Sequence, residues 1–296
     1  MKNIILFLFL LLNVNLLAES KVTFVPYISY ANYDGSTSDT NSTDTNSTIQ
    51  SNGPIKNDAI IGLYSLIDDG YQSIEFSVEL KYLKYTSGEE LTQINLATSY
   101  KKYLLKNLKL NTLLHYISNN IASNGATIAL VGLDYISEND FTLGIESAYS
   151  SYGSNSLADK ILQIKPSASF AYGHKNSDWG VIYPGISMYY IKPYSQNTSL
   201  NNSYFSTELD LTHKKGSFTT KLQYWFGEQL YAVRDDGFTI YNLNEVHNSG
   251  TALSMHYKVD NSLGIKTSYI SEYYTRIGST SEEYMDRLLF VADFSF

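Results

Sequence analysis

The dominant feature of this sequence is a two-residue alternation of apolar and polar side chains that recurs along its length. In YQSIEFSVELKY, the even positions from Ile74 to Tyr82 are apolar and the odd positions from Glu75 to Lys81 are polar. Successive side chains of a β-strand point to opposite faces of the sheet, so the pattern predicts strands with one apolar and one polar face. The repetition of one pattern predicts an all-β fold.

About fourteen segments show this alternation. They lie near residues 21-33, 58-67, 71-86, 91-104, 108-119, 126-137, 141-152, 160-173, 179-192, 203-213, 217-229, 249-259, 263-275 and 283-296. The segments 58-67 and 179-192 carry apolar residues on both faces, and Pro184 interrupts the second. Without this pair of segments the strand count would be about twelve.

The connections between the segments alternate between long and short. The polar stretch 34-57 is followed by the tight turn DDG, SGEE is followed by LKN, and EQLYAVRDDGFTIYNLNEVH is followed by VDNS. Short turns on one side and longer, variable loops on the other are typical of a barrel that spans an outer membrane. A soluble β-sandwich or β-solenoid would also alternate, but it has no reason to keep short turns on one side only.

Membrane insertion explains why these features occur together. In hydrocarbon every backbone donor and acceptor must be paired within the protein, so a sheet spans a membrane only by closing on itself. Closure turns the apolar face toward lipid and the polar face toward the interior. About 20 residues per strand and connection accommodate a tilted span of about 9–11 residues. The sequence predicts a closed antiparallel up-and-down transmembrane β-barrel, a single domain over residues 21-296.

The first residues, MKNIILFLFLLLNVNLLAES, predict an exported protein. A basic residue precedes an apolar run, and small residues follow at Ala18 and Ser20, which is the layout of a secretory signal peptide. We expect a signal peptide over residues 1-20 that is cleaved after Ala18 or Ser20. A retained membrane anchor is the alternative, and the short core interrupted by two asparagines disfavours it.

Composition supports an exported barrel and argues against one class of partner. The 296 residues include no Cys and 27 Tyr, and their formal net charge is −8. Without cysteines, the fold cannot depend on disulfide bonds. Tyrosine is favoured both in strands and at membrane interfaces. The acidic balance argues against binding of nucleic acid, because phosphate contacts need a basic surface.

The last stretch, RLLFVADFSF, carries Phe290, Phe294 and Phe296 on one face. It resembles the C-terminal targeting signal of Gram-negative outer-membrane β-barrel proteins, which ends in Phe after alternating hydrophobic residues. The resemblance implies recognition by the barrel assembly machinery and contact with outer-membrane lipid and lipopolysaccharide. Both termini would then be periplasmic. By strand number and length the chain is similar to the monomeric porin G class, which implies a monomer but carries over no functional residues.

The polar faces place charges of both signs inside the predicted barrel. The predicted lumen-lining residues are Glu75, Glu79, Lys81, Lys101, Lys109, Glu146, Lys165, Glu208, Asp210, Lys221, Lys266 and Arg287. A barrel of about fourteen strands has room for water unless a loop plugs it, and opposed charges give a weak ion preference. This interpretation is a channel for passive diffusion of small hydrophilic solutes, with no cofactor.

The alternative function is a plugged or filled surface-exposed barrel whose charges pair across a closed interior. Such a protein would be a structural, adhesin or autotransporter-like translocator barrel that acts through its extracellular loops. The two longest loops, 34-57 and 230-248, are where gating or plugging would occur. In the second loop, Phe238, Ile240 and Leu243 would fold back as a short hairpin into or over the mouth.

The loop 34-57 contains a duplicated sequence, DTNSTDTNST. Its low complexity predicts a disordered segment. Asn41 and Asn46 each lie in D-x-N-x-T, which resembles the acceptor sequence of bacterial N-glycosylation, so sugar would cover this loop. The plainer interpretation is a solvated spacer rich in Asn and Thr.

Neither an enzyme nor a metal site is predicted. LLHYISNN resembles the active-site strand of outer-membrane lipases, in which a His and a Ser share a face. Here Ser118 follows His115 by three residues, so the two side chains point to opposite faces of a strand. Among the remaining histidines, His247 is expected in a loop, and no HxH pair or Cys supports a metal site.

Overall fold

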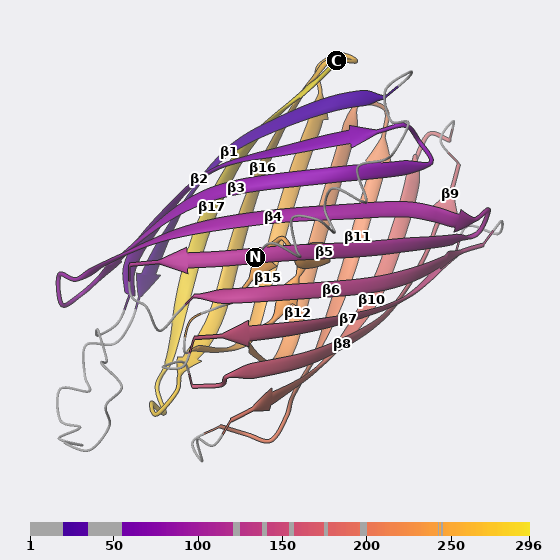
Figure 1. Cartoon of the computed structure of the whole chain (residues 1–296). Helices are drawn as coiled ribbons and strands as arrows, with labels where there is room; N and C mark the ends of the chain where they lie inside the picture. Colours follow the sequence, from indigo (N-terminus) through magenta and orange to yellow (C-terminus); the bar gives the residue numbers. More distant parts are fainter. Residues whose placement is uncertain are drawn as a thin grey trace, which may run out of the picture.

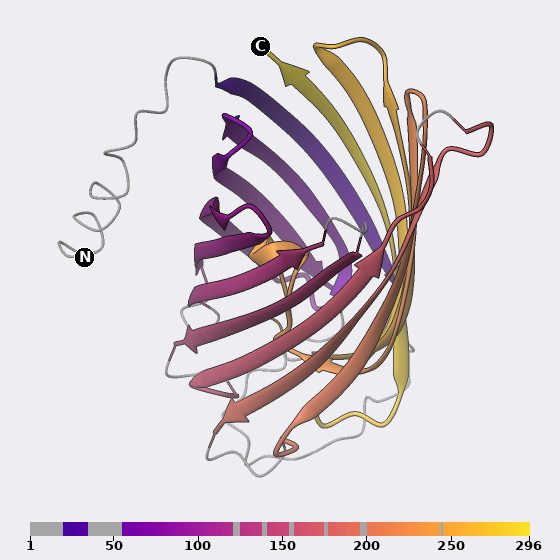
Figure 2. The same cartoon turned by 90° about the vertical axis from the view of Figure 1, so that its right-hand side faces the viewer.

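The computed structural model is a closed antiparallel barrel of fourteen strands (Figures 1 and 2). It describes residues 20–34, 55–120, 125–137, 141–153, 157–174, 177–195, 200–241, 243 and 245–296. Residues 1–19 of the expected signal peptide, with the possible cleavage position after Ala18, lie outside these residues, as do the candidate glycosylation positions Asn41 and Asn46. No helix in the described ranges is long and apolar enough to cross a membrane.

Each strand of the barrel pairs with its neighbours in sequence. The strands of the first half are β1 (Lys21–Asp34), β2 (Ile55–Asp68), β3 (Gln72–Tyr85), β4 (Glu90–Leu105), β5 (Leu108–Asn119), β6 (Ala126–Ile136) and β7 (Phe141–Tyr152). Those of the second half are β8 (Lys160–Phe170) with its short continuation β9 (Tyr172–Gly173), β10 (Val181–Tyr194), β11 (Tyr204–Lys215), β12 (Phe218–Leu230), β15 (Glu245–Lys258), β16 (Leu263–Arg276) and β17 (Glu282–Ser295). The predicted up-and-down topology is confirmed.

The first and last strands close the barrel, as the sequence predicts. β1 and β17 face each other from Thr23 opposite Ser295 to Asp34 opposite Tyr284. The pairing extends to the final residue: the Phe296 amide donates to the Val22 carbonyl at 2.8 Å. Closure therefore satisfies the backbone groups that an open sheet edge would expose.

The two weakest strand predictions are also strands, which excludes the alternative of twelve. β2 and β10 are both 14 residues long. Pro184 interrupts only one side of β10, because β8 pairs with β10 from Gly185 onward and β9 pairs with it at Ile182. Proline has no amide hydrogen to donate, which accounts for the break between β8 and β9.

The connections differ in length between the two ends of the barrel. Connections of two to seven residues lie at the end that also carries Lys21 and Phe296, which we call the turn end. Connections of four to twenty residues lie at the opposite, loop end. The turns are tightened by side chains such as Asp260, which accepts hydrogen bonds from the amides of Ser262 and Leu263.

The strands present an apolar face outward and a mixed face inward. On β3, Phe76 and Val78 are more than 40% exposed on the outer face, whereas Glu75 is buried on the inner face. On β17, Phe290 and Phe294 also point outward. So many exposed apolar side chains are unfavourable in water, but they match the lipid-facing band of a membrane barrel.

Candidate functional site: an infolded loop and the cavity beside it

The connection between β12 and β15 folds into the barrel instead of extending from it (Figure 2). We call the described residues of this connection, 231–241 and 243, the infolded loop. Within it, β13 (Val233–Arg234) and β14 (Thr239–Ile240) form a short hairpin around the 3-10 turn η2 (Asp235–Gly237). The predicted hairpin lies within the barrel and contains Phe238 and Ile240, whereas Leu243 lies beyond its second strand.

The loop backbone is held in an unfavourable conformation. Tyr231, Asp235 and Asp236 have φ of 53°, 49° and 54°, a region that non-glycine residues rarely occupy. Each such residue costs about 1–3 kcal/mol unless its surroundings hold it in place. The contacts of the loop with the barrel wall must offset this cost.

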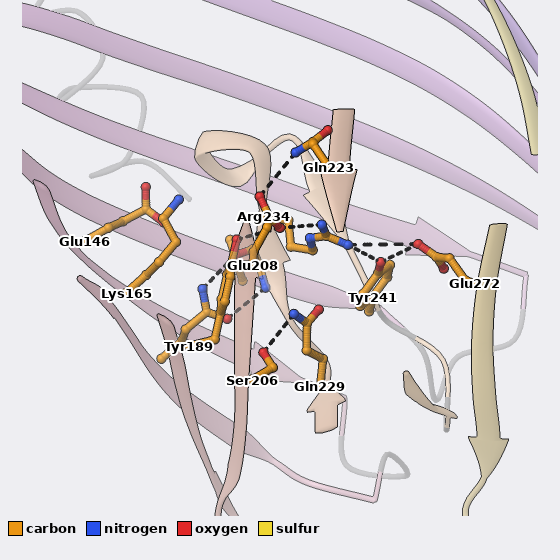
Figure 3. A network of polar contacts seen from close by, with 12 residues as sticks. Glu146, Lys165, Tyr189, Ser206, Glu208, Gln223, Gln229, Arg234, Tyr241 and Glu272 are labelled. Carbon is orange, nitrogen blue, oxygen red and sulfur yellow. Dashed lines mark hydrogen bonds and ion pairs between the residues drawn. The ribbon is translucent and has the colours of Figure 1, made fainter. Parts of the chain in front are cut away.

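Arg234 makes the densest set of these contacts (Figure 3). Its guanidinium donates to Glu208 Oε2 at 2.5 Å and to the Tyr241 hydroxyl at 2.6 Å, and it lies 4.1 Å from the ring centroid of Trp225. The Tyr241 hydroxyl in turn donates to Glu272 Oε1 at 2.6 Å. Buried arginine of this kind is stabilised only when carboxylates and acceptors surround it.

Glu272 also contacts a wall histidine that stacks on the loop residue Tyr241. His247 Nδ1 lies 3.0 Å from Glu272 Oε2, and its ring stacks on Tyr241 with centroids 3.7 Å apart. His247 belongs to β15, so the expectation that it lies in a loop is wrong. The strand begins earlier than the alternation suggests because a β-bulge near His247 shifts the pattern by one residue.

Four further wall strands hold the loop. Gln163 of β8 makes two hydrogen bonds to the Val233 backbone, donating to its carbonyl at 2.6 Å and accepting from its amide at 2.9 Å. His115 Nδ1 of β5 lies 2.9 Å from the Gly237 carbonyl oxygen, and Lys101 Nζ of β4 lies 3.0 Å from Asp236. On β2, Tyr64 packs edge-on against Phe238, with centroids 5.4 Å apart. These contacts add to those that Glu208, Trp225, His247 and Glu272 make from β11, β12, β15 and β16.

The Lys101–Asp236 contact also affects the pKa of the Asp236 carboxyl group. Burial raises the pKa of Asp236, and Lys101 and Lys165 lower it by more, so the pKa lies below the usual 3.8. The side chain keeps 51% of its surface accessible to the lumen, so water screens part of this attraction. Asp236 is therefore ionised at neutral pH.

Apolar packing closes the lumen on one side of the loop. Leu230, Tyr231, Ala232 and Val233 join the inner faces of β5 to β8, β10 and β11 in one cluster. The wall contributes Leu113, Ile117, Ala126, Ile128, Leu130, Ala148, Tyr152, Ile161, Tyr189, Ile191 and Tyr204. These inward apolar residues explain why the alternation is weakest in β10, whose inner face packs on the loop.

On the other side of the loop the lumen holds a cavity of about 800 Å³. Its wall is formed by the inner faces of β1 to β4, β11, β12 and β15 to β17. Its other boundary is formed by loop residues between 234 and 241 and by Leu243. It runs from Asp293 near the turn end to Tyr33 near the loop end. The infolded loop thus leaves a cavity on one side of the lumen.

Two inward-facing glycines leave room for large rings at the wall of this cavity. An added Cβ at Gly62 would lie 2.2 Å from Tyr27 Cζ, and one at Gly250 would lie 2.2 Å from Trp225 Cζ2. The rings of Tyr27 and Trp225 therefore lie flat against the neighbouring strand. Tyr27 reaches across Gly62 to donate a hydrogen bond to Glu79 at 2.9 Å.

Several of the predicted lumen-lining residues form ion pairs with one another. Lys101 Nζ lies 3.1 Å from Glu75 Oε1, and Lys165 Nζ lies 3.3 Å from Glu146 Oε1. Glu208 pairs with Arg234 of the loop and also accepts hydrogen bonds from the wall residues Tyr189 and Gln223. Of these five side chains, Lys101 and Glu208 contact the loop directly.

Two other predicted residues meet a carboxylate that was not singled out from the sequence. Arg287 and Lys81 lie 2.6 Å and 3.8 Å from Asp58, which is fully buried. Tyr33 also donates a hydrogen bond to Asp58 at 2.9 Å. The two cations and the hydroxyl donor compensate the buried charge of Asp58, so it is not a free charge in the cavity.

The remaining predicted residues have no ion pair within 4.0 Å in the described part of the chain. Glu79 accepts hydrogen bonds from Tyr27 and Asn95 only. Glu79, Lys221 and Lys266 line the cavity, whereas Asp210 lies against Gly185 of β10. The full set without a pair is Glu79, Lys109, Asp210, Lys221 and Lys266.

The alternation of the sequence indicates no role for Arg234, Asp235 or Asp236. Their stretch, RDDG, lies between the apolar and aromatic residues of YAV and FTIY, unlike the Ser- and Asn-rich stretches of other loops. That composition is the signal of a loop whose apolar and aromatic side chains can be buried against the barrel wall. It does not indicate which wall residues the charges would meet.

The histidine and serine of β5 do not form a catalytic pair. His115 is buried on the inner face against Gly237, whereas Ser118 lies on the outward-facing side of the strand, as alternation predicts. Among the described residues, no group of three His, Cys, Asp or Glu side chains could hold a metal ion.

Comparison with known proteins places the fold in one class. No protein-family model and no curated protein matches the chain. The CymD monoaromatic hydrocarbon channel is 9% identical with a TM-score of 0.54, and the match covers 94% of this chain and 88% of that one. The Ralstonia pickettii toluene transporter TbuX is 8% identical with a TM-score of 0.53, over 95% and 90% of the two chains.

A bacterial polysaccharide outer membrane secretin is similar to the same extent. It is 11% identical with a TM-score of 0.52, and the match covers 94% of this chain and 98% of that one. At these identities the likeness defines the fold alone. The fold is that of a Gram-negative outer-membrane β-barrel.

Proposed function

We propose that this protein is a channel of the bacterial outer membrane through which small hydrophilic solutes diffuse passively. The observation that carries the proposal is the cavity of about 800 Å³ beside the infolded loop. Fourteen strands enclose a lumen wider than side chains alone fill. The loop occupies one side, and the cavity on the other side is lined by Glu79, Lys221 and Lys266, which have no ion pairs.

The proposal includes the surroundings of the barrel. The apolar outer face supports contact with outer-membrane lipid and lipopolysaccharide. Both termini lie at the turn end, and by the usual asymmetry of such barrels this end would be periplasmic. Phe290, Phe294 and Phe296 on the closing strand would be read by the barrel assembly machinery, and the mature chain would be residues 21-296, functioning as a monomer.

A filled barrel that acts through its extracellular loops is the second candidate. One observation favours it: Leu243 packs on a cluster formed by Ile55, Leu83, Tyr85 and Leu91 at the loop end. Such apolar packing would narrow the outer mouth of the cavity. In that case the anchored loop would be a permanent plug.

The experiment that separates the two candidates is conductance of the purified, refolded barrel in a planar lipid bilayer across a salt gradient. A channel gives stable stepwise openings with weak ion preference, because the charges in the cavity are of both signs. A folded barrel that inserts and stays silent would contradict the channel and favour the filled barrel.

A further inference from the structure

Two lysines without ion pairs lie close together on the cavity wall. Lys221 of β12 faces Ser254, and Lys266 of β16 faces His256, so both lysines flank the same part of β15. In the described ranges, neither amine has a carboxylate within 4.0 Å. Both side chains line the cavity. Their charges are therefore available to a solute.

Carboxylates lie near the two amines without pairing with them. His256 is engaged by Asp293, with Nε2 and Oδ1 2.9 Å apart. Asp210 lies over Gly185 on the side of β11 away from β12, and its charge acts on Lys221 from beyond ion-pair distance. The loop contributes Asp235, whose charge acts on Lys266 in the same way. Both amines therefore keep positions from which they can contact a solute in the cavity.

An apolar surface adjoins the lysines. Val291 of β17 is paired with Lys266, and Leu289 of β17 and Val25 of β1 also line the cavity. Phe238 of the loop packs on Tyr64, which is paired with Val25. The cavity therefore offers apolar and aromatic side chains as well as the two amines.

We propose that the cavity binds small organic anions with an apolar body, such as aryl carboxylates. The carboxylate would lie between Lys221 and Lys266, with the Ser254 and Ser268 hydroxyls close by, and the ring would lie on Val291 and Leu289. Amines and hydroxyls bind the charge while apolar burial holds the ring, which is the division of labour seen in ligand pockets. The inference rests on the proposed function, since a channel needs a route to this cavity.

A tryptophan in the cavity provides the readout. The chain has two tryptophans: Trp179 is 83% exposed near the turn end, and Trp225 is 1% exposed and lines the cavity. In the Trp179→Phe variant, Trp225 is the sole reporter. The barrel in lipid nanodiscs is titrated with 4-bromobenzoate, with bromoacetate as the anion without a ring and 4-bromobenzyl alcohol as the ring without a charge.

The expected result is saturable quenching by 4-bromobenzoate at a concentration about tenfold lower than for either control probe. Changing both Lys221 and Lys266 to Gln should weaken 4-bromobenzoate about tenfold and leave 4-bromobenzyl alcohol unchanged. Val291→Thr, which is similar in shape, should weaken it less. Lys258→Gln is the matched control, because Lys258 lies on β15 outside the cavity.

Other outcomes overturn the inference. Equal quenching by all three probes, or quenching that the lysine variants do not change, would show that no anion site exists. Circular dichroism and the heat-dependent gel shift of each variant identify loss of folding. Quenching needs no ion current, so the two proposals can fail separately. A barrel that binds the anion but does not conduct would contradict only the channel. A conducting barrel that shows no preference among the three probes would contradict only the anion site.

Discussion

At the scale of single residues, the width of the cavity depends on glycines against which large side chains lie flat. Tyr27 lies across Gly62, and its hydroxyl reaches Glu79. Side chains of this size would otherwise project into the cavity. The width of the cavity therefore depends on the glycines of the wall as much as on the residues that line it.

Gly62→Ala tests this relation. The new methyl group would lie 2.2 Å from the Tyr27 ring, so the ring must swing into the cavity and release Glu79. We expect a lower single-channel conductance and a loss of about 1–3 kcal/mol in the free energy of unfolding. Gly132→Ala is the matched control, because its nearest contact would be an ordinary 3.6 Å. Equal effects of the two variants would argue against the role of Gly62.

The Lys101–Asp236 contact has a defined pH dependence. The pKa of Asp236 is lowered in the folded protein, so its contribution is complete above the usual 3.8 and is lost as pH falls through the lowered value. Current noise from loop motion should rise in Asp236→Asn. The difference between this variant and the wild type should stay constant from about pH 8 to 5 and shrink below about pH 4. A difference that disappears near neutral pH would contradict the assignment.

At the scale of elements, alternation predicted the strands well because it is a local signal of pleated backbone with two different faces. β5 and β7 begin and end at the predicted residues. Alternation was weak in β2 and β10 for a physical reason. Their inner faces carry residues such as Tyr64 and Ile191, which pack on the infolded loop and not on water.

The closing strand supplies a prediction for assembly. Phe296 pairs with Val22, and its ring packs edge-on with Phe24 at 6.3 Å. If the last strand is the assembly signal, Phe296→Ala should reduce the barrel recovered from the outer membrane of a Gram-negative host about tenfold. Tyr172→Ala removes an aromatic ring that is similarly exposed at 72% and should leave recovery unchanged. Equal recovery of both variants would exclude the signal.

At the scale of the whole molecule, the sequence indicated a barrel but not the state of its interior. The contacts that dock the loop join residues far apart in the chain, such as Gln163 with Val233. Alternation places Gln163 on the inner face but cannot pair it with a loop residue. For the same reason, the sequence identified most charges of the lumen but not which of them remain without partners.

We predict that the infolded loop, not the barrel wall, sets the width of the open lumen. Replacing residues 232–243 with Gly-Ser-Gly-Ser removes Arg234 and the other wall contacts of this segment, while the wall strands keep their pairing. Thr239→Ser serves as the conservative control within the same loop.

The most direct test is the single-channel conductance of the shortened barrel beside that of the wild type in the same bilayer. We predict that the shortened barrel conducts at least about twofold more, since its lumen approaches the full width of fourteen strands. A folded, inserted barrel whose conductance does not change when the loop is removed would contradict the account.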